Sequence, residues 1–510
     1  MARGGVKRLS AETLAGLPRS VSRPAYDRRA VAAGIVHLGV GNFHRAHQAV
    51  YADEALGAGD QRWGVTGVSL RSAATRDALA PQDGLYTLLE RGPAGTTARV
   101  IGALREVLVA PESPPAVVAR LADPRTAIVT LTLTEKGYGR APGGAGLDRE
   151  APAIARDLAE PGRPSSAVGL LHAAARARRA AGAGGFTVLS CDNLSGNGRQ
   201  TRALLLEFAD AAGEGLGPWI ERAFSFPDSM VDRIVPRTTD QERALVRERL
   251  GVEDAWPVAT EPFRQWVIED VFVAGRPRWE DFGVSFVADV AAWEQMKLRM
   301  LNAAHSCIAW LGRPAGWDTV DRAIAVPALR RFIEALWREE VAPTLPPAVR
   351  DQAASYAASL LVRFDNAALA HRTAQIAMDG SQKLPLRLLP TLHQRLAEGR
   401  PFDRLALGVA AWIRDVGGRD EAGGRYPLDD PLAGLLQDAL AAAGDDPGRR
   451  VDAVLALPGL FPPEVAADAR LRVALTRHLT RLTTSGSLGA LHALERDLAA
   501  NPGDSPRGAA

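Results

Sequence analysis

The hydrophobic residues follow two different patterns along the chain, and the pattern changes near residue 290. Before this point, short apolar runs rich in Val and Ile alternate with longer helical stretches. After it, apolar residues recur at helical spacing to about residue 498. Strands that alternate with helices favour a parallel sheet. The chain is therefore expected to be an α/β protein with a second, mostly α-helical domain.

Four apolar runs are the candidate strands of the parallel sheet, and they occupy residues 34–39, 63–70, 127–134 and 186–190. Each run is followed by a polar or glycine-containing turn. Because the runs are continuously apolar, we expect both faces of the sheet to be covered. The expected organisation is an N-terminal extension at residues 1–30, an α/β domain at 31–290, a helical domain at 291–498 and a flexible tail at 499–510.

Composition narrows the class of protein. The chain has 510 residues, of which 46% are hydrophobic and 24% are charged, as in a soluble globular protein of two or three domains. Its 61 Lys and Arg and 59 Asp and Glu are spread along the chain, so we expect no basic surface for nucleic acid. No segment approaches the roughly 18 apolar residues of a membrane span, and residues 1–30 lack the apolar core of a signal peptide. With only two cysteines, the chain is expected in a reducing compartment, the cytoplasm.

The first candidate site is the sequence GVGNFH at residues 39–44, which ends the first strand and precedes a helical stretch. Two glycines here permit a tight turn and let the backbone approach a pyrophosphate. His44 stands where the usual fingerprint has a third small residue, so a plain strand-to-helix turn is the alternative. The residues predicted to bind a dinucleotide are Gly39, Gly41, Asn42 and Phe43.

The end of the second strand bears on which dinucleotide is bound. An acidic residue for the ribose of NAD usually stands here, and the sequence VSLRS at residues 68–72 has none. Arg71 could accept the 2′-phosphate of NADP. We therefore include Arg71 in the predicted cofactor site and leave NADP open beside NAD.

The second candidate site is the helix-forming run EQMKLRMLNAAH at residues 294–305. With the roughly 100° per residue of an α-helix, Asn302 is expected about 140° and His305 about 80° around the axis from Lys297, so one wall presents all three. A buried Lys is rare unless it is paired or functional. The alternative is a surface Lys beside an Asn and a His that satisfy hydrogen bonds in the core.

A polar turn, SCDNLSGNG at residues 190–198, follows the fourth strand, where open α/β sheets hold ligands. Its alternative interpretation is an Asx-rich turn and helix cap. Together the two sites indicate alcohol and ketone chemistry. A desolvated Lys297 would move the hydroxyl proton, and the amides of Asn193 and Asn302 would hold the carbonyl oxygen as charge builds.

Six motifs, in order from about residue 30 to about residue 490, resemble the polyol-specific long-chain dehydrogenases, the mannitol dehydrogenase family. The motifs are Gly39-x-Gly-x-Phe-His-Arg-Ala-His47, Cys191-Asp-Asn193, residues 230–236, residues 261–270, Lys297-x4-Asn302-x2-His305 and Asp379-Gly-Ser-Gln-Lys383. The resemblance implies a zinc-independent, NAD-dependent oxidoreductase. It also implies an N-terminal Rossmann-type domain, a mostly helical C-terminal domain and an active site between them.

The resemblance also implies roles for individual residues. Lys297 would be the general acid and base, and Asn193 and Asn302 would be the oxyanion donors. His305 would contact a substrate hydroxyl and help to position the reacting carbon. The remaining matches are Asp232 and Lys383 as substrate contacts and Glu294 as a gate for proton exit.

The cations of these motifs look closer to those of fructuronate reductases than to those of mannitol enzymes. Gln375 stands where the mannitol enzymes have a substrate-contacting Arg, and Lys136 stands where they tend to have Gly. A uronate carboxylate needs a charge-assisted partner, which a polyol does not. The candidate partners are Lys136, Arg264, Arg299 and Arg372, with Arg372 preferred. The alternative is that these cations pair with Glu261, Glu269 or Asp270.

The sequence therefore predicts the reversible reduction of D-fructuronate to D-mannonate with NADH. The alternative is a mannitol 2-dehydrogenase or a related enzyme that oxidises a polyol to its 2-ketose. A cofactor-binding regulator without chemistry is disfavoured, because the complete set of catalytic candidates is present. The expected partner is a sugar acid or polyol, with no metal, nucleic acid or membrane, and the expected assembly is a monomer or small homo-oligomer.

Overall fold

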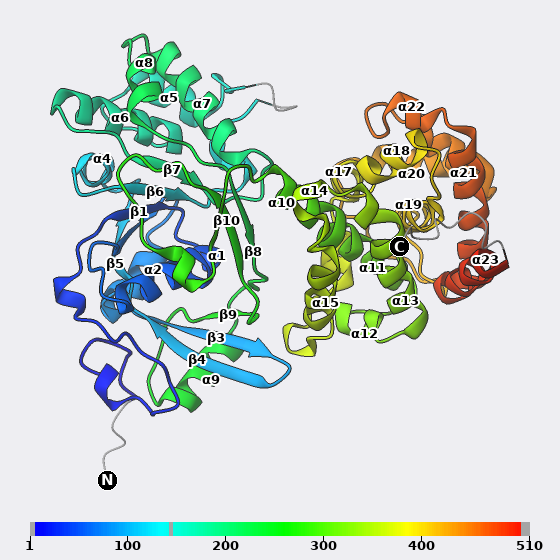
Figure 1. Cartoon of the computed structure of the whole chain (residues 1–510), viewed down its shortest axis with the longest axis horizontal. Helices are drawn as coiled ribbons and strands as arrows, with labels where there is room; N and C mark the ends of the chain where they lie inside the picture. The colour runs from blue at the N-terminus through cyan, green and yellow to red at the C-terminus, as the bar shows by residue number, and fades with distance from the viewer. Residues whose placement is uncertain (1–5, 142–145, 501–510) are drawn as a thin grey trace. The chain divides into compact units, whose positions relative to one another are not determined.

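The computed structural model describes residues 6–141 and 146–500, and Figure 1 shows the course of the chain. The chain divides into two compact units, Met1–Ala291 and Ala292–Ala510, which are considered separately below. The expected tail falls almost wholly outside the described residues, and the last described helix runs to Ala500. No helix in the described part combines the length and apolar character that a membrane crossing requires.

The first unit is built on a five-stranded parallel sheet, which confirms the predicted α/β fold. Its order is β5 (Leu104–Val109), β2 (Val65–Ser69), β1 (Ile35–Leu38), β6 (Ile128–Leu131) and β7 (Thr187–Ser190). The four predicted strands are all present, and β5 is an additional one. The strands β1, β6 and β7 end level with one another, because Leu38 pairs with Leu131 and Leu131 with Ser190. This level edge is where the candidate ligand-binding turns begin.

Both faces of the parallel sheet are covered, as the continuous apolar runs predicted. Ile35 and Val65 belong to one buried cluster, while Val36 and Leu38 belong to another on the opposite face. The helices of this unit are α1 (Asn42–Ala46), α2 (Gln48–Gly57), α3 (Ala74–Leu79), α4 (Pro114–Ala122), α5 (Pro152–Ala159), α6 (Ala167–Ala180), α7 (Asn197–Ala212), α8 (Gly217–Ala223) and α9 (Asp240–Leu250). Consecutive residues of β1 thus pack in different clusters, one on each face of the sheet.

Two small sheets complete the first unit, and the sequence analysis predicted neither. One has the order β11 (Ser285–Val287), β10 (Gln265–Glu269) and β8 (Ser229–Asp232). The other has the order β4 (Gly95–Ile101), β3 (Tyr86–Gly92) and β9 (Val258–Thr260). The segment assigned to an N-terminal extension contributes to this unit, because Leu9, Leu17 and Val21 pack in a cluster with β3 and β4.

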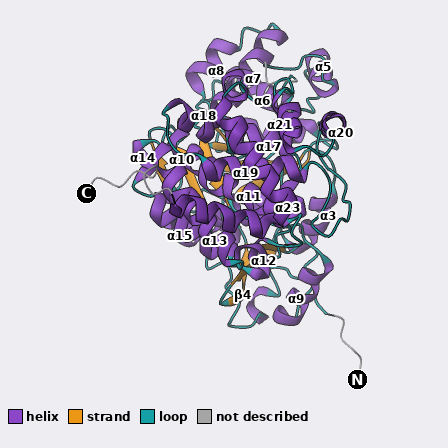
Figure 2. Ribbon diagram, turned by 90° about the vertical axis from the view of Figure 1, so that its right-hand side faces the viewer, coloured by secondary structure: helices purple, strands orange, loops and turns teal. Residues whose placement is uncertain are grey.

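The regular elements of the second unit are all helices in its described part, with no strand among those residues, and Figure 2 draws helices in purple and loops in teal. Its core is α11 (Ala303–Gly312), which is buried on all sides and packs against α19 (Asp403–Asp415), and α19 lies along α23 (Ala469–Ala500). The other helices are α10 (Ala291–Met296), α12 (Val320–Ile324), α13 (Pro327–Ala335), α14 (Pro347–Arg350), α15 (Ala353–Phe364), α16 (Thr373–Ala377), α17 (Gly380–Arg387), α18 (Leu389–Ala397), α20 (Ala433–Ala443), α21 (Pro447–Leu455) and α22 (Pro463–Ala466).

Two segments of the second unit are π-helices, Lys297–Asn302 and Leu336–Val341. The first lies between α10 and α11, where the sequence predicted regular α-helix, so the α-helical angles expected there are wrong. Ala303 N–H donates to the carbonyl of Leu298, five residues earlier. Trp337 of the second π-helix donates its indole N–H to the carbonyl of Met300, at 2.9 Å. One π-helix therefore supports the other, and such segments often mark functional sites.

Candidate active site

The two glycines of the loop after β1 have different structural roles. Gly39 has φ +99°, and a Cβ added to it would lie 2.1 Å from the carbonyl oxygen of Thr132, so no other residue fits. Gly41 starts α1, and a Cβ there would meet nothing closer than the Gly39 oxygen, 3.9 Å away. Gly39 is thus required by the fold, whereas Gly41 leaves bare backbone facing open space. Such a loop fits the close approach of a pyrophosphate.

His44 departs from the dinucleotide fingerprint because its ring fills a place inside the first unit. It stacks on His37 of β1 with ring centroids 3.4 Å apart. His37 lies 2.7 Å from the Thr130 hydroxyl and 3.1 Å from the Gly39 carbonyl oxygen. Burial lowers the pKa of His37 to about 3, and burial beside His37 and Arg45 holds the pKa of His44 well below its usual range. Two neutral rings therefore support the glycine turn from beneath.

The other predicted cofactor residues lie around this turn. The Asn42 amide donates to the carbonyl of Pro236 at 3.2 Å and accepts from Arg45 at 2.7 Å, so its side chain braces the loop. The half-buried Phe43 stacks on His47 with ring centroids 5.1 Å apart. Arg71 is exposed, two residues after β2. The roles of these residues toward a cofactor stay predictions.

The turn after β7 is held by Asp192, which the sequence analysis gave no role of its own. Its carboxylate accepts from the backbone N–H of Leu133 at 2.8 Å and of Thr134 at 3.1 Å, and from the hydroxyl of Tyr138 at 2.6 Å. These bonds tie the end of β6 to the end of β7. The exposed Asn193 follows directly, and this tie fixes the backbone that carries it. Lys136 belongs to the 3₁₀-helix Glu135–Tyr138, but its side chain lies outside the described structure.

Two family motifs of the first unit form the pair of strands β8 and β10. Asp232 ends β8, is buried, and stands opposite Gln265 in the antiparallel pair. Next to it, the guanidinium of the buried Arg233 donates to the carbonyl of Glu261 at 2.9 Å. Arg264 forms an ion pair with Glu54 at 2.8 Å, not with any of the three carboxylates named as alternatives. The motif cations thus fix strands and loops around Asp232.

In the second unit, the catalytic candidates lie on one continuous helical segment. Glu294, Lys297, Asn302 and His305 are all buried, with exposed fractions of 8 to 9%. The π-helix spans the interval from Lys297 to Asn302. Because i→i+5 bonding widens the turn, these two residues lie more nearly above one another than the expected 140°. The segment thus gathers four polar side chains inside an apolar helical unit.

His305 faces an aromatic and cationic environment. Its ring lies 4.8 Å from the Phe364 ring and 5.4 Å from the His371 ring, centroid to centroid. Its Nε2 atom is buried and has no hydrogen-bond partner in the described structure. Burial, with smaller contributions from His371 and nearby Arg and Lys side chains, holds the pKa of His305 well below its usual range. His305 is therefore neutral and has one ring nitrogen left for a ligand.

Helix α17 supplies two of the cations near His305. Lys383 Nζ donates to the carbonyls of Ile376, at 3.1 Å, and Met378, and burial lowers the pKa of Lys383 to about 8. Arg387, one turn later, donates to the Asn302 carbonyl at 3.3 Å and to the Ser306 hydroxyl at 3.0 Å. Burial lowers the pKa of Arg387 to about 10. Within the described residues, no carboxylate forms an ion pair with either cation.

The structure adds residues to this cluster that the sequence analysis missed. Arg363 and Arg387 both act electrostatically on His305, although neither belongs to a recognised motif. Arg372 is exposed at the start of α16 and is not among the groups that act on His305. Arg299 donates to the Thr344 carbonyl at 2.7 Å, which gives it a supporting role. Only the spacing of Arg387, four residues after Lys383 on one helix face, could have indicated it from sequence.

Among the described residues, no group of three or more His, Cys, Asp and Glu is placed to hold a metal ion.

Two solved structures share the fold over nearly the whole chain. The ternary complex of Pseudomonas fluorescens mannitol 2-dehydrogenase with NAD and D-mannitol has a TM-score of 0.83 and 38% identity, covering 96% of this chain and 99% of that one. Substrate-free D-sorbitol dehydrogenase has a TM-score of 0.88 and 36% identity, covering 95% and 100%.

Sequence comparison gives the same result. Mannitol 2-dehydrogenase of Pyrenophora tritici-repentis is 42% identical over 488 residues, which are 94% of this chain and 85% of that protein. D-mannonate oxidoreductase of Escherichia coli is also 42% identical, over 480 residues, which are 93% and 98%. The family model of the mannitol dehydrogenase Rossmann domain matches residues 33–281, and that of the mannitol dehydrogenase C-terminal domain matches residues 289–483. The chain therefore belongs to the mannitol dehydrogenase family of oxidoreductases.

Proposed function

We propose that this enzyme interconverts a 2-ketohexuronate and its aldonate, D-fructuronate and D-mannonate, with NAD as cofactor and without zinc. The observation that carries the proposal is the cationic surrounding of His305, to which Arg363, Lys383 and Arg387 contribute. Burial works against the charges of Lys383 and Arg387, whose pKa values it lowers, because water is replaced by protein. An anionic substrate would offset this cost through charge-assisted hydrogen bonds. A neutral polyol offers no such compensation.

The catalytic roles follow from the buried segment around the π-helix. Lys297 gives a proton to the alkoxide as the ketone is reduced, and takes it back in the oxidation. Asn302 and Asn193 donate amide hydrogens to the oxygen that gains charge in the transition state. His305, neutral and with a buried Nε2 without a partner, accepts a hydrogen bond from a substrate hydroxyl. Glu294, three residues before Lys297, passes the proton onward.

Further groups bind the substrate away from the reacting carbon. Asp232 is assigned to a substrate hydroxyl and Lys383 to a hydroxyl or the carboxylate. Arg372 and Lys136 stay our first assignments for the carboxylate, with the half-buried Arg387 as the alternative. In this assignment, the groups that transfer the proton and stabilise the oxyanion belong to rigid elements. Long cationic side chains recognise the charge of the substrate.

The cofactor assignment rests on the loop after β1. The bound nicotinamide supplies the hydride in the reduction. Gly39 keeps the turn tight and Gly41 leaves backbone open for the pyrophosphate. We propose NADH as the preferred reductant, with Arg71 as the group that would admit NADPH. The thiols of Cys191 and Cys307 are both buried and free, which suits our proposal of a cytoplasmic enzyme. We also propose that it acts as a monomer or small homo-oligomer.

A second function, mannitol 2-dehydrogenase or a related polyol dehydrogenase, has support from the relatives, several of which are named mannitol 2-dehydrogenase. Steady-state assays of the purified chain with fructuronate, tagaturonate and fructose, each with NADH and with NADPH, separate the two. We expect the highest kcat/KM with fructuronate and NADH. A higher value with fructose would return the enzyme to the polyol group. Comparable values for the two cofactors would show that Arg71 accepts the phosphate.

A further inference from the structure

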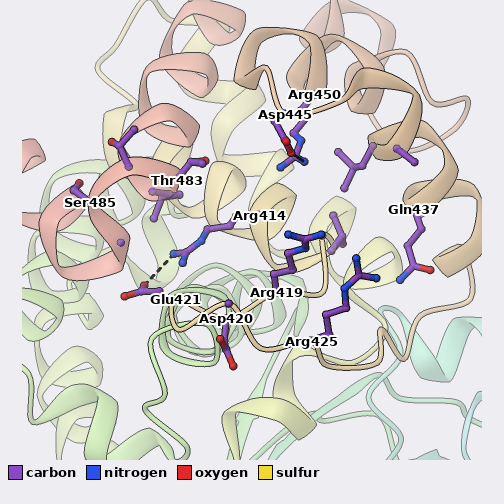
Figure 3. A pocket seen from close by; sticks show the side chains of 18 residues that line it. Arg414, Arg419, Asp420, Glu421, Arg425, Gln437, Asp445, Arg450, Thr483 and Ser485 are labelled. Carbon is purple, nitrogen blue, oxygen red and sulfur yellow. Dashed lines mark hydrogen bonds and ion pairs between the residues drawn. The ribbon is translucent and has the colours of Figure 1, made fainter.

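The second unit contains a cavity of about 860 Å³ that the proposed reaction does not use. It lies between the end of α19, the loop that follows it, α20, the α20–α21 connection and the middle of α23 (Figure 3). None of Lys297, Asn302 and His305 lines it. Its volume is within the range of roughly 300–1,000 Å³ that small-molecule sites have.

Two arginines of the loop stand side by side in this cavity. Arg419 and Arg425 face each other across an antiparallel backbone bridge, and Figure 3 shows both side chains leaving the loop toward the cavity. The turn between them is closed by the Asp420 N–H to Gly424 carbonyl bond, 2.9 Å long. Like charges directly opposite each other across a strand pair destabilise the pair. A counter-charge between the two guanidinium groups would remove this cost.

The protein itself does not supply that counter-charge. Glu421 is paired with Arg414 at 3.0 Å, drawn as a dashed line in Figure 3, and Asp445 is paired with Arg450 at 2.7 Å. Asp420, the third acidic residue of the lining, accepts from the backbone N–H of Ala422 at 3.0 Å and of Gly424 at 2.7 Å. In the described part of the chain, no carboxylate forms an ion pair with Arg419 or Arg425.

Neutral hydrogen-bonding groups line other parts of the cavity. Thr483 and Ser485 of α23 donate their hydroxyl hydrogens to the carbonyls of Leu479 and Arg481, each at 2.8 Å. Their oxygens therefore keep acceptor capacity. The exposed amide of Gln437 on α20 is both donor and acceptor. The cavity thus combines two adjacent guanidinium groups with hydrogen-bond acceptors for hydroxyl groups.

We infer that this cavity binds a phosphomonoester of a small polyhydroxy compound, with the phosphate between Arg419 and Arg425. Two guanidinium groups match the oxygens of a phosphate dianion through bidentate hydrogen bonds. The hydroxyl groups of the ligand meet Thr483, Ser485 and Gln437. This site is separate from the proposed active site, and its occupation does not depend on which substrate the enzyme reduces.

The test is isothermal titration calorimetry of the full chain saturated with NADH, with glucose 6-phosphate as the probe. Glucose, inorganic phosphate and citrate are titrated in parallel. The variant Arg419→Gln/Arg425→Gln removes both proposed phosphate ligands. The matched control is Arg400→Gln/Arg496→Gln, which makes the same change of charge at two exposed positions of the same unit outside the cavity. Thermal unfolding of each variant checks that it is folded.

We expect submillimolar binding of glucose 6-phosphate, weaker binding of inorganic phosphate and none of glucose. The cavity variant should bind the sugar phosphate at least about tenfold more weakly, because it loses the charge-assisted hydrogen bonds of both guanidinium groups, while the control variant should match the wild type. The inference is overturned if the wild type does not bind the probe, or if both double variants bind it equally. Tighter binding of citrate than of glucose 6-phosphate, lost in the cavity variant, would overturn the phosphomonoester and assign the site to polycarboxylates.

Discussion

The glycine loop of the first unit and the buried segment around Lys297 in the second, which we propose to serve one reaction, are built in opposite ways. In the loop, side chains are absent or packed against the framework: the His44 ring stacks on His37 of β1, which bonds to Thr130 and to the loop carbonyl. In the buried segment, polar side chains are enclosed while His305 Nε2 keeps no partner among the described residues. Binding sites for a cofactor backbone thus come from bare main chain, whereas chemistry needs side chains that are buried and incompletely satisfied.

The substitution with the largest expected effect is Lys297→Ala, which removes the proposed general acid and base. We expect kcat to fall by about 10²- to 10⁴-fold, because general acid–base catalysis typically contributes that much. NADH affinity, measured by fluorescence titration, should stay near the wild-type value, since the cofactor residues belong to the other unit. The control is Leu298→Ala, which truncates the neighbouring half-buried side chain. A loss below fivefold between pH 6 and 9 would remove Lys297 from the mechanism.

The next largest effect is expected when a cation that we propose to bind the substrate carboxylate is replaced. Arg372→Ala should weaken fructuronate reduction by about 2–4 kcal/mol, which is roughly 30- to 900-fold in kcat/KM, and fructose reduction far less. Arg387→Gln should slow both substrates, because this side chain supports the Asn302 carbonyl, and fructuronate further, because one of the positive charges around His305 is lost. If instead the loss that is selective for fructuronate is larger for Arg387→Gln than for Arg372→Ala, the carboxylate lies against the half-buried Arg387. Equal losses on both substrates in both variants would contradict any carboxylate site in this group.

The two amides provide a comparison across the units. Asn302→Ala and Asn193→Ala should each lower kcat by about 10- to 10³-fold, the scale of removing one oxyanion donor. Asn302 is buried on the π-helix and Asn193 is exposed after β7, so a ground-state role is easier to detect for Asn193. If either variant changes KM alone, that residue binds the ground state and is not an oxyanion donor.

The two units also differ in how far the sequence predicts them. Four of the five strands of the parallel sheet were predictable, because runs such as residues 127–134 are rich in apolar and β-branched residues and are bounded by turns. The edge strand β5 was missed because the half-buried Arg105 and Glu106 interrupt its apolar pattern. The π-helix was missed because i→i+5 bonding leaves no trace in a pattern that fits an α-helix equally well.

The candidate site divides in the same way. Sequence motifs indicated Lys297, Asn302 and His305, because chemistry restricts residue type and spacing. They did not indicate Arg363 or Arg387, which reach the same place from α15 and α17. Contacts between helices far apart in the chain depend on tertiary packing, which single-sequence periodicity does not encode.

A smaller effect is expected from the protonation of Lys383, whose pKa burial lowers to about 8. An anionic product such as mannonate should bind the protonated lysine, so its affinity should fall about tenfold between pH 7 and 9 as the proton is lost. Titration calorimetry of mannonate with the NAD⁺-bound enzyme measures this directly. Lys383→Arg should abolish the fall, because arginine stays charged throughout. The same pH dependence in that variant would assign the titration to another group.

The last prediction concerns the pH dependence of stability, with the smallest effect on activity. It involves Glu340 on the second π-helix. Its buried carboxyl accepts the backbone N–H groups of Arg404 and Leu405, each at 2.9 Å, and burial raises its pKa to about 7. The unfolded chain releases this proton near pH 4.3. Between that pH and about 7 the native state therefore binds the extra proton, so its stability falls as pH rises.

Glu340→Gln keeps this position neutral at every pH. The Tm of the variant minus that of the wild type should therefore increase by a few degrees from pH 5 to pH 8, at about 2–4 °C for each kcal/mol in a unit of this size. The matched control is Glu339→Gln, whose side chain is half-exposed and pairs with Arg404 at 2.6 Å. It should show no such trend. A Tm difference for Glu340→Gln that is constant with pH would mean that the carboxylate is already ionised in the folded unit, held by the N-terminus of α19.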